Sequence, residues 1–499
     1  MFEVHGAPAQ LSDEALISTL TAATRAEASA AAWRLALVAE VAGRQCDDED
    51  EDVAHQVIDG WAFAKAQVSA ACNVSAPAAS KQMRIGVALR HRLPRTAAVF
   101  AQGAVPAAVI DAITWRTRLV EDADALALID AAIAAEASGY GTKSEAGLVG
   151  AVDVWVEKFD PAAVVRSRVA AKDIYLEFDD RDDPNGVASF WGRLRVTDKK
   201  ALEQRLDDLA ATVCGNDPRS VRERRADALG ALGVVGPQVQ RLTCQCGDPG
   251  CAGSGKDPRS AAVTIYVLTD QVPVPEVVVA EVGSPSTRQE PAACRAPGSP
   301  GVMVGGGVIP AAMLADLVAT GAKVTPLAQV ADLGPEPRHD PSVKLAALVR
   351  MRYLVCAFPG CCRPAHRCDL DHVVPWPAGA THPGNMAPLC REHHLVKTFC
   401  GWEPVLSADG TVTWTAPTGH RYAKAAGASV AFAHGLIRTA VPPPRPVTIT
   451  GRGDRGVMMP KRRRTRAQDY AQRVKAERAR NAAELDVGRT EYEANPPPY

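Results

Sequence analysis

The chain has 499 residues, of which 47% are hydrophobic, so it is long enough for about three folded units with buried cores. This composition excludes a wholly disordered protein. Its 56 Lys and Arg residues are balanced by 57 Asp and Glu residues, which leaves a net charge of −1. The chain as a whole is therefore not expected to prefer nucleic acid, and any such affinity must be local.

Cysteine usage and hydropathy indicate a cytoplasmic protein. Thirteen cysteines are too few for a disulfide scaffold, and their odd number favours a reducing compartment. The first residues lack the basic segment of a signal peptide. The longest uncharged run, residues 296–315, is interrupted by prolines and glycines, so no membrane-spanning helix is expected.

The first region, residues 1–155, is predicted to be helical. An Ala-rich helix is expected over about 12–44, with Ser12 as its N-cap, and it ends at the acidic run 47–52. Further helices follow, and one break between them lies near 72–75. This break is typical of the ordinary packing of two helices, although a helix-turn-helix has similar spacing.

Residues 156–340 are predicted to form an α+β region with a Pro- and Gly-rich insertion. Alternating hydrophobic residues over 173–178 and 189–196 predict a β-hairpin. Two helices and a strand are expected to follow it, near 199–213, 221–232 and 261–268. The insertion, residues 283–308, has the composition of a loop.

Three cysteines of this region lie close together in the sequence. Cys244, Cys246 and Cys251 fall among glycines and a proline. Three thiolates are one ligand short of a structural zinc site, which needs four. Cys214 or Cys294 could complete the set only through the fold, and unliganded thiols in a loop are the simpler interpretation.

Cysteine and histidine are concentrated in residues 356–400, which hold six of the thirteen cysteines and five histidines. Cys356-x4-Cys361 and Cys390-x2-His393 form two short-spaced pairs, the arrangement that a tetrahedral Zn²⁺ site needs. A segment of this size with few aromatic residues also needs a cross-link other than hydrophobic burial. The sequence therefore predicts a structural zinc.

Neighbouring residues leave alternatives for one of the four ligands. Cys362 is adjacent to Cys361 and could replace it, and His366 and Cys368 lie close to both. Cys361 is the preferred ligand because its spacing from Cys356 matches a zinc knuckle.

Four further residues lie between these two pairs or directly after the second pair. They are Asp371-His372, Asn385 and a second histidine, His394, next to the knuckle. In this order and spacing they resemble the zinc-containing ββα-metal family of HNH nucleases, and the resemblance covers about residues 341–424. Each pair alone would be a weak signal, but all of these residues rarely occur together in this order by chance, so the combination is specific.

The resemblance implies a catalytic site for hydrolysis of phosphodiester bonds in DNA. It makes His372 the general base that takes a proton from water. Asp371 and His394 would hold one divalent cation, for which mixed carboxylate and imidazole ligands suit Mg²⁺ or Mn²⁺. Asn385 would orient His372 and tie together the two halves of the loop.

The arrangement of the whole chain is similar to the actinobacterial 13E12 repeat family, in which a long domain of unknown function precedes an HNH domain. The looser matches that support this similarity are Leu93-Pro94-Arg95-Thr96, Trp191-Gly192-Arg193-Leu194 and Cys244-x-Cys246. One departure lies in the HNH motif, where the usual Gly-Gly-Thr turn has Ala380 in its centre. Its cost depends on whether residue 380 must take a positive φ angle.

Two stretches carry the positive charge that the whole chain lacks. Residues 341–424 contain nine Lys or Arg and five Asp or Glu, and Arg391 and Lys397 of this domain are expected to meet the phosphate backbone. The tail, residues 425–499, is basic and is predicted to be largely disordered, with a helix as the alternative. Its candidates for nucleic-acid binding are Lys461, Arg462, Arg463 and Arg464.

The sequence therefore predicts an α+β protein with a mostly helical N-terminal region, an α+β middle region, a C-terminal ββα-metal zinc module and a basic tail. The predicted function is metal-dependent cleavage of DNA. A non-catalytic, zinc-stabilised DNA-binding or regulatory protein is the alternative, and RNA is the less favoured substrate. No motif fixes an oligomeric state.

Overall fold

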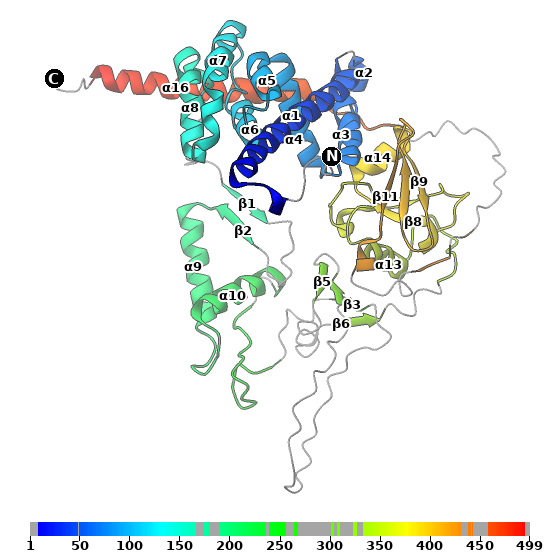
Figure 1. Cartoon of the computed structure of the whole chain (residues 1–499). Helices are drawn as coiled ribbons and strands as arrows, with labels where there is room; N and C mark the ends of the chain where they lie inside the picture. The colour runs from blue at the N-terminus through cyan, green and yellow to red at the C-terminus, as the bar shows by residue number, and fades with distance from the viewer. Residues whose placement is uncertain are drawn as a thin grey trace.

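The computed structural model has an α+β fold, as the sequence predicts (Figure 1). It describes residues 8–47, 49–165, 174–178, 189–235, 239–255, 264–267, 301–303, 307–309, 323–326, 333–430, 438–440, 442 and 458–494. Cys294, most of the predicted insertion and the turn expected between the hairpin strands lie outside these residues. Among the helices described here, none is both long enough and apolar enough to cross a membrane.

The N-terminal part is a helical domain built around α1 (Asp13–Cys46). Ser12 caps this helix by accepting a hydrogen bond from the backbone N–H of Ala15 at 3.3 Å. Buried aliphatic and aromatic side chains, among them Phe100, Ile113 and Ile129, form the core of the domain. The other helices are α2 (Glu51–Ala54), α3 (Gly60–Cys72), α4 (Ala76–His91), α5 (Pro94–Ala101), α6 (Ala107–Arg116), α7 (Ala123–Glu136) and α8 (Glu145–Phe159).

The break predicted near residues 72–75 joins two helices that pack against α1. Asn73 takes the left-handed conformation, with φ of 50°, and Ser75 caps α4. Arg90 of α4 pairs with Glu40 of α1 at 2.8 Å. Arg92 donates to two backbone carbonyls between α6 and α7. These two arginines at the C-terminal end of α4 thus contact their own domain, which supports ordinary helix packing.

A buried carboxylate determines how α5 begins. Leu93 at the N-cap of α5 offers no side-chain cap, and Asp130 of α7 takes that role. Asp130 is 2% exposed and accepts hydrogen bonds from the backbone N–H groups of Arg95 and Thr96, at 2.8 and 2.9 Å, and from the Thr96 hydroxyl at 2.7 Å. A carboxylate at this position satisfies unpaired N–H groups and favours the helix dipole.

The middle region contains the predicted hairpin and helices. Strands β1 (Tyr175–Phe178) and β2 (Phe190–Arg193) pair antiparallel. Helices α9 (Val196–Ala210) and α10 (Val221–Val235) pack around a small core. A four-stranded sheet in the order β5-β4-β3-β6 follows, with bounds β3 (Thr264–Val267), β4 (Gly301–Met303), β5 (Gly307–Ile309) and β6 (Lys323–Pro326).

This sheet corrects one expectation. Strand β4 lies inside the stretch 283–308 that the sequence predicts to be a loop, and β5 begins inside it. Strand β4 pairs with β3, more than thirty residues earlier in the chain. Glycine-rich segments have weak local strand propensity, and pairing with a distant strand overrides it.

The C-terminal domain contains two small antiparallel sheets around aromatic side chains. Phe358, Trp402 and Trp414 are buried at its centre. Strands β7 and β8 form one sheet, and the other has the order β11-β10-β9. The elements are α13 (Val343–Tyr353), β7 (Asp369–His372), β8 (Met386–Leu389), α14 (Arg391–Phe399), β9 (Glu403–Leu406), β10 (Val412–Thr415) and β11 (Arg421–Lys424). Short 3-10 helices lie at Pro8–Gln10, Ala137–Thr142, Pro161–Ala163, Ala365–Arg367, Pro383–Asn385 and Gly427–Val430.

The C-terminal domain shares its hydrophobic core with helix α3 of the helical domain. Ala62, Ala66 and Ala70 of α3 belong to the same buried cluster as the C-terminal aromatic residues. Lys65 of α3 also pairs with Glu392 of α14 at 2.8 Å, and both side chains are largely buried. Helix α14 is therefore held from outside its own domain.

The tail ends in a helix, α16 (Arg466–Ala494), that lies along the helical domain (Figure 1). Val474 is buried in the core of that domain. Arg478 pairs with Asp160 at 2.7 Å, and Asn481 donates to two backbone carbonyls after α8. The expectation of a largely disordered tail is wrong for these residues, because their contacts are tertiary and leave no local signal.

Asp59 joins the tail to the helical domain. Its side chain is 3% exposed, caps α3 through the N–H of Ala62, and contacts both Arg462 and Arg466. Burial alone would raise the pKa of this carboxyl group, but the hydrogen bond from Arg466 and the other donors outweigh burial and hold the pKa below its ordinary value.

We expect Asp59→Asn to destabilise the protein by about 1–3 kcal/mol, since the amide keeps the cap but leaves two arginines without their carboxylate. Because the pKa of Asp59 is lower in the folded state, the contribution is complete above the unfolded pKa of about 3.9 and is lost as the pH falls through the folded pKa. Thermal unfolding and limited proteolysis of the tail measure the effect. Asp52→Asn is the control, because its pair with Lys461 is exposed to solvent and contributes little to stability. Equal effects of the two variants would contradict the assignment.

Candidate metal centre

Strands β7 and β8 and helix α14 bring the motif residues together. The strands pair antiparallel, with Asp371 opposite Ala387 and His372 opposite Met386. Helix α14 begins directly after β8, with Cys390 as its N-cap residue. Because the end of β8 lies opposite the start of β7, helix α14 begins beside Asp369, the first residue of β7.

Four buried side chains converge at the start of α14: those of Cys356, Cys361, Cys390 and His393, whose ligand atoms all lie within 4.8 Å of one another. Nδ1 of His393 is 3.2 Å from Sγ of Cys390 and 3.6 Å from Sγ of Cys356. Tetrahedral zinc with Zn–S bonds of about 2.3 Å separates its ligand atoms by about 3.8 Å. The group could therefore hold zinc.

The structure separates the alternatives that the sequence leaves open for the second ligand. Cys361 is buried within the group, whereas its neighbour Cys362 is exposed. Cys368 is buried outside the group, and its thiol donates to the carbonyl of Pro364 at 3.4 Å. His366 is exposed.

The surroundings of the group hold its members in place. The ring of Phe358 stacks on His393, with centroids 4.0 Å apart and an interplanar angle of 9°. The backbone N–H of Cys390 donates to Sγ of Cys356 at 3.3 Å. Burial raises the pKa of Cys356, while hydrogen bonds from Cys356 and Cys361 lower the pKa of Cys390. Buried thiols of this kind need a cation before all of them can ionise.

The two adjacent histidines of α14 point to different partners. His393 contacts the cysteines, and His394 contacts acidic residues of β7. Nε2 of His394 is 3.4 Å from Asp371 Oδ1, and Nδ1 is 2.9 Å from Asp369 Oδ2. The hydrogen bond to Asp371 raises the pKa of His394. Burial would raise the pKa of Asp371, but His394 and Lys397 together lower it.

Lys397 does not lie where the sequence analysis expects it. Its ammonium is 2.6 Å from Asp371 Oδ2 and also donates to the backbone carbonyl of His372. Its side chain is only 12% exposed. Lys397 thus neutralises Asp371 instead of facing outward to a phosphate, because one helical turn beyond His394 also faces β7.

His372 is held in one orientation by Thr381. Its Nε2 is 2.8 Å from the Thr381 hydroxyl, which also donates to the carbonyl of Arg338 and lies 3.3 Å from that of His339. Carbonyls only accept, so the hydroxyl proton points to them and Nε2 of His372 is the donor. Nδ1 then carries the free lone pair. Burial, followed by the nearby His339, lowers the pKa of His372.

Asn385 closes the loop between β7 and β8 with its amide group. Its Oδ1 accepts from the N–H of Val374 at 2.8 Å, and its Nδ2 donates to the carbonyls of Val374 and Ala380, both at 3.0 Å. The loop packs so closely that a Cβ at Gly379 would lie 2.0 Å from the Val374 carbonyl oxygen. Ala380 is not among the positive-φ residues, so its replacement of glycine costs no strain.

Some of the candidate phosphate contacts are exposed, and others pair with residues of the protein itself. Arg391 is 65% exposed beside Asp369. In the tail, Arg462 contacts Asp59 and the carbonyl of Gln56, while Lys461 contacts Asp52. The remaining two tail candidates, Arg463 and Arg464, are exposed.

Three residues that contact the motif residues have no role predicted from the sequence: Thr381, Asp369 and His339. Asp369 had a usable signal, because it lies two residues before Asp371 and so on the same face of β7. His339 had none, since it reaches His372 only through the fold.

Comparison with known proteins identifies relatives over nearly the whole chain. The family described as "Domain of unknown function (DUF222)" matches residues 22–352. The uncharacterized protein Rv2100 of Mycobacterium tuberculosis strain H37Rv is 42% identical over 507 residues, which cover 97% of this chain and 90% of that protein. The uncharacterized protein Rv3776 of the same strain is also 42% identical, over 94% of this chain and 90% of its own length. No solved structure matches the chain significantly.

We expect Cys361→Ser to remove the metal from the C-terminal domain and unfold it, because zinc binding of this kind is worth about 10–16 kcal/mol in zinc-finger peptides. Cys362→Ser, the adjacent exposed position, should leave the domain intact. Near-ultraviolet circular dichroism of the buried Trp402 and Trp414 and zinc analysis compare the variants. Equal spectra and equal zinc would argue against Cys361 as a ligand.

We expect Gly379→Ala to destabilise the domain by about 1–3 kcal/mol, because the added methyl group would overlap backbone and the Asn385 amide. Gly334→Ala is the matched control, since a Cβ there meets no atom within 4 Å. Urea unfolding of both variants measures the difference. An unchanged free energy of unfolding in Gly379→Ala would show that the loop can shift to accommodate the methyl group.

Proposed function

The chain belongs to the DUF222 family, and we propose that its C-terminal domain makes it a metal-dependent HNH endonuclease that hydrolyses phosphodiester bonds in DNA. The observation that carries this proposal is the pairing of Asp371 of β7 with His394 of α14, with His372 next to Asp371 in β7 and the buried group of three cysteines and a histidine beside them. Hydrolysis of a phosphodiester needs a base for water and positive charge near the phosphate, and this arrangement offers groups for both.

His372 is the proposed general base. Because the N–H at Nε2 donates a hydrogen bond to Thr381, Nδ1 is left to accept a proton from water. Its lowered pKa keeps the imidazole neutral near neutral pH, the form in which it can act as a base. Asn385 positions this group by fixing the loop that follows His372.

Asp371 and His394 are the residues that would hold the catalytic cation. Their nearest oxygen and nitrogen atoms are 3.4 Å apart, close to the roughly 3.0 Å between neighbouring ligands of an octahedral ion with bonds of about 2.1 Å. Mg²⁺ or Mn²⁺ bound there would supply positive charge to the phosphate. Lys397 helps to keep Asp371 ionised as long as no cation is bound.

Zinc in the four-residue group would have a structural role. Cys356 and Cys361 lie before β7, and Cys390 and His393 lie at the start of α14. A metal bound by all four would fix α14 relative to the segment before β7 and would thereby help to set the distance between Asp371 and His394. All four protein ligands are used, so no position remains for substrate.

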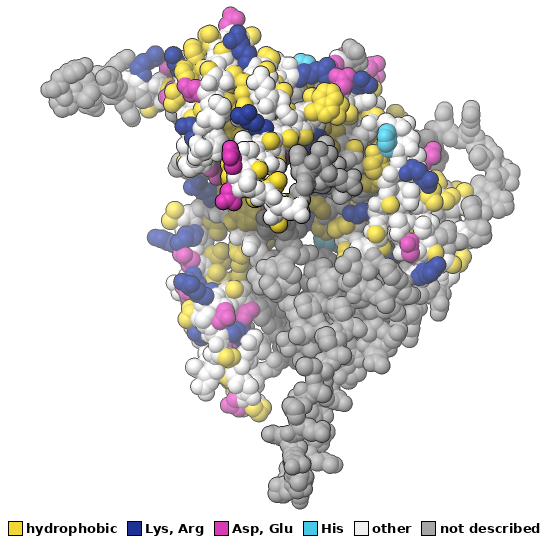
Figure 2. All heavy atoms as spheres, in the orientation of Figure 1, with side chains coloured by type: hydrophobic (Ala, Val, Ile, Leu, Met, Phe, Trp, Pro, Cys, Tyr) yellow, Lys and Arg dark blue, Asp and Glu magenta, His cyan; other side chains and the backbone are white. Residues whose placement is uncertain are grey.

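The proposed DNA contacts are limited to a few exposed arginines in the C-terminal domain and the tail. Arg391 is exposed at the start of α14, and Arg463 and Arg464 are exposed in the tail. On the face shown in Figure 2, basic and acidic side chains of the helical domain are interspersed. The domain of residues 341–424 carries an excess of positive charge and is the favoured surface for the phosphate backbone.

A non-catalytic, zinc-stabilised DNA-binding or regulatory protein is the second candidate. Two observations favour it: Lys397 already neutralises Asp371, and His372 is only 4% exposed. Both would have to rearrange for water and a cation to reach the site.

Cleavage of supercoiled plasmid by the purified full chain, with Mg²⁺ or Mn²⁺, tests the proposal. We expect His372→Ala to lower the rate by about 10²–10⁴-fold while zinc content and DNA affinity are unchanged, because only the base is lost. His366→Ala is the matched control, as it replaces an exposed histidine of the same domain and should keep full activity.

The other outcomes separate the alternatives. Equal cleavage by wild type and His372→Ala would indicate a contaminating nuclease and overturn the assignment of the base. DNA binding without cleavage by any variant would establish the binding protein. Cleavage of single-stranded RNA in preference to duplex DNA would correct the substrate.

A further inference from the structure

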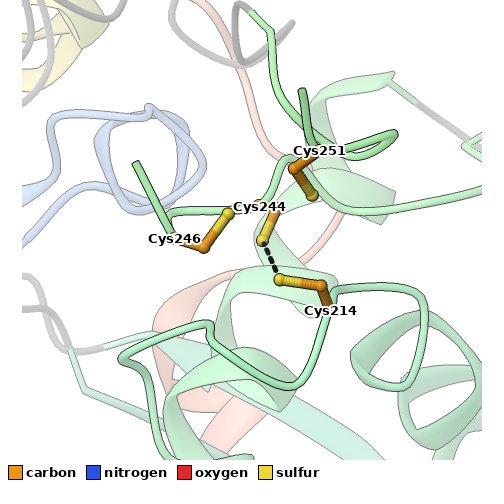
Figure 3. Close-up of side chains that lie close together, drawn as sticks. All are labelled: Cys214, Cys244, Cys246 and Cys251. Carbon is orange, nitrogen blue, oxygen red and sulfur yellow. Dashed lines mark hydrogen bonds between the residues drawn. The ribbon is translucent and has the colours of Figure 1, made fainter. Parts of the chain in front are cut away.

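A second group of convergent ligands lies in the middle region, far in sequence from the C-terminal domain. The side chains of Cys214, Cys244, Cys246 and Cys251 point toward one another, with all four Sγ atoms within 4.8 Å (Figure 3). Sγ of Cys214 is 3.5 Å from Sγ of Cys244. The fold thus supplies Cys214, from the turn between α9 and α10, as a fourth partner for the three cysteines clustered in the sequence.

The spacing of these sulfur atoms matches four ligands of one ion. Tetrahedral zinc with Zn–S bonds of about 2.3 Å holds its sulfurs about 3.8 Å apart, whereas a disulfide needs about 2.05 Å. All four cysteines are free thiols. Four thiolates in a tetrahedral group favour zinc over harder divalent cations, which prefer oxygen ligands.

The backbone around the sulfurs is shaped to present them. The N–H of Cys244 donates to the carbonyl of Gly253 at 2.8 Å, and the N–H of Gly253 lies 3.4 Å from Sγ of Cys251. A Cβ at Gly253 would lie 2.9 Å from Cβ of Cys244, so the close approach requires glycine. N–H groups directed at sulfur are typical of the surroundings of thiolate ligands.

A buried ion-pair network holds the two ligand-bearing segments against each other. The carboxylate of Asp217, just after Cys214, pairs with Arg219 at 2.7 Å and accepts from the N–H of Gln245 at 3.0 Å. Arg219 in turn donates to the carbonyl of Thr243 at 2.8 Å. The residues on either side of Cys244 are thereby fixed to the turn that carries Cys214, before any metal binds.

The α9–α10 unit has a small hydrophobic core for its size. Within the described chain its buried core cluster consists of Leu209, Ala228, Ala231, Val239 and Leu242. Units with so little apolar burial usually need a metal or a disulfide for stability. A metal bound by Cys214 and the 244–251 segment would tie the helix pair to the chain that follows it.

We propose that Cys214, Cys244, Cys246 and Cys251 bind a second Zn²⁺, which stabilises the α9–α10 unit and is independent of the C-terminal domain. Each thiol that binds as thiolate releases its proton to solvent. The site uses four protein ligands and has no open position, so its role is structural.

Zinc content per chain, measured on the full-length protein purified without chelator, tests this proposal. We expect two zinc ions in the wild type, one in Cys251→Ser, one in Cys361→Ser and none in the double variant. Cys362→Ser, an exposed cysteine outside both groups, should keep two. One zinc in the wild type, unchanged by Cys251→Ser, would overturn the proposal whatever the result of the nuclease assay.

A second measurement avoids dependence on the folding of variants. Native wild-type protein is alkylated with iodoacetamide before and after exposure to a zinc chelator, and modified cysteines are identified by peptide mass spectrometry. Cys244, Cys246 and Cys251 should be protected until the chelator is added, while the exposed Cys362 reacts throughout. Reaction before chelation, or a disulfide between Cys214 and Cys244, would contradict zinc binding.

Discussion

The convergence of three cysteines and one histidine at the start of α14 is the constraint on which the rest of the C-terminal domain depends. These groups are buried together, and their thiols cannot all ionise without a cation. Their position fixes α14 against the segment before β7. Because His394 follows His393 directly, the same constraint sets His394 beside Asp371. The ligand of the proposed structural zinc, His393, and the ligand of the proposed catalytic cation, His394, thus lie in the same helical turn.

The C-terminal domain is also tied to the helical domain. Alanines of α3 complete its core, and Lys65 pairs with Glu392 of α14. The tail returns to the same helix, where Arg462 and Arg466 meet Asp59 at its N-terminus. Helix α3 is therefore held at its start by the tail and along its length by the C-terminal domain. It connects these two parts of the protein.

Charge pairing inside the protein occupies several groups that a sequence alone would assign to nucleic acid. Arg462 contacts Asp59, Lys461 contacts Asp52, and Lys397 contacts Asp371. Arg391 remains exposed. The basic residues of this chain therefore serve its own packing first, and the proposed DNA contacts depend on the smaller set that is left.

The sequence by itself determined the α+β class and the short-range ligand pairs, because spacing within one helix turn or one knuckle is set by local backbone geometry. Only the tertiary structure decided that Cys361 and not Cys362 joins the group, that Cys214 completes the second one, and that Lys397 turns inward. The strands β4 and β5 and the docking of α16 were likewise decided there. Each of these depends on contacts between segments far apart in the chain, which burial and pairing determine and local patterns do not record.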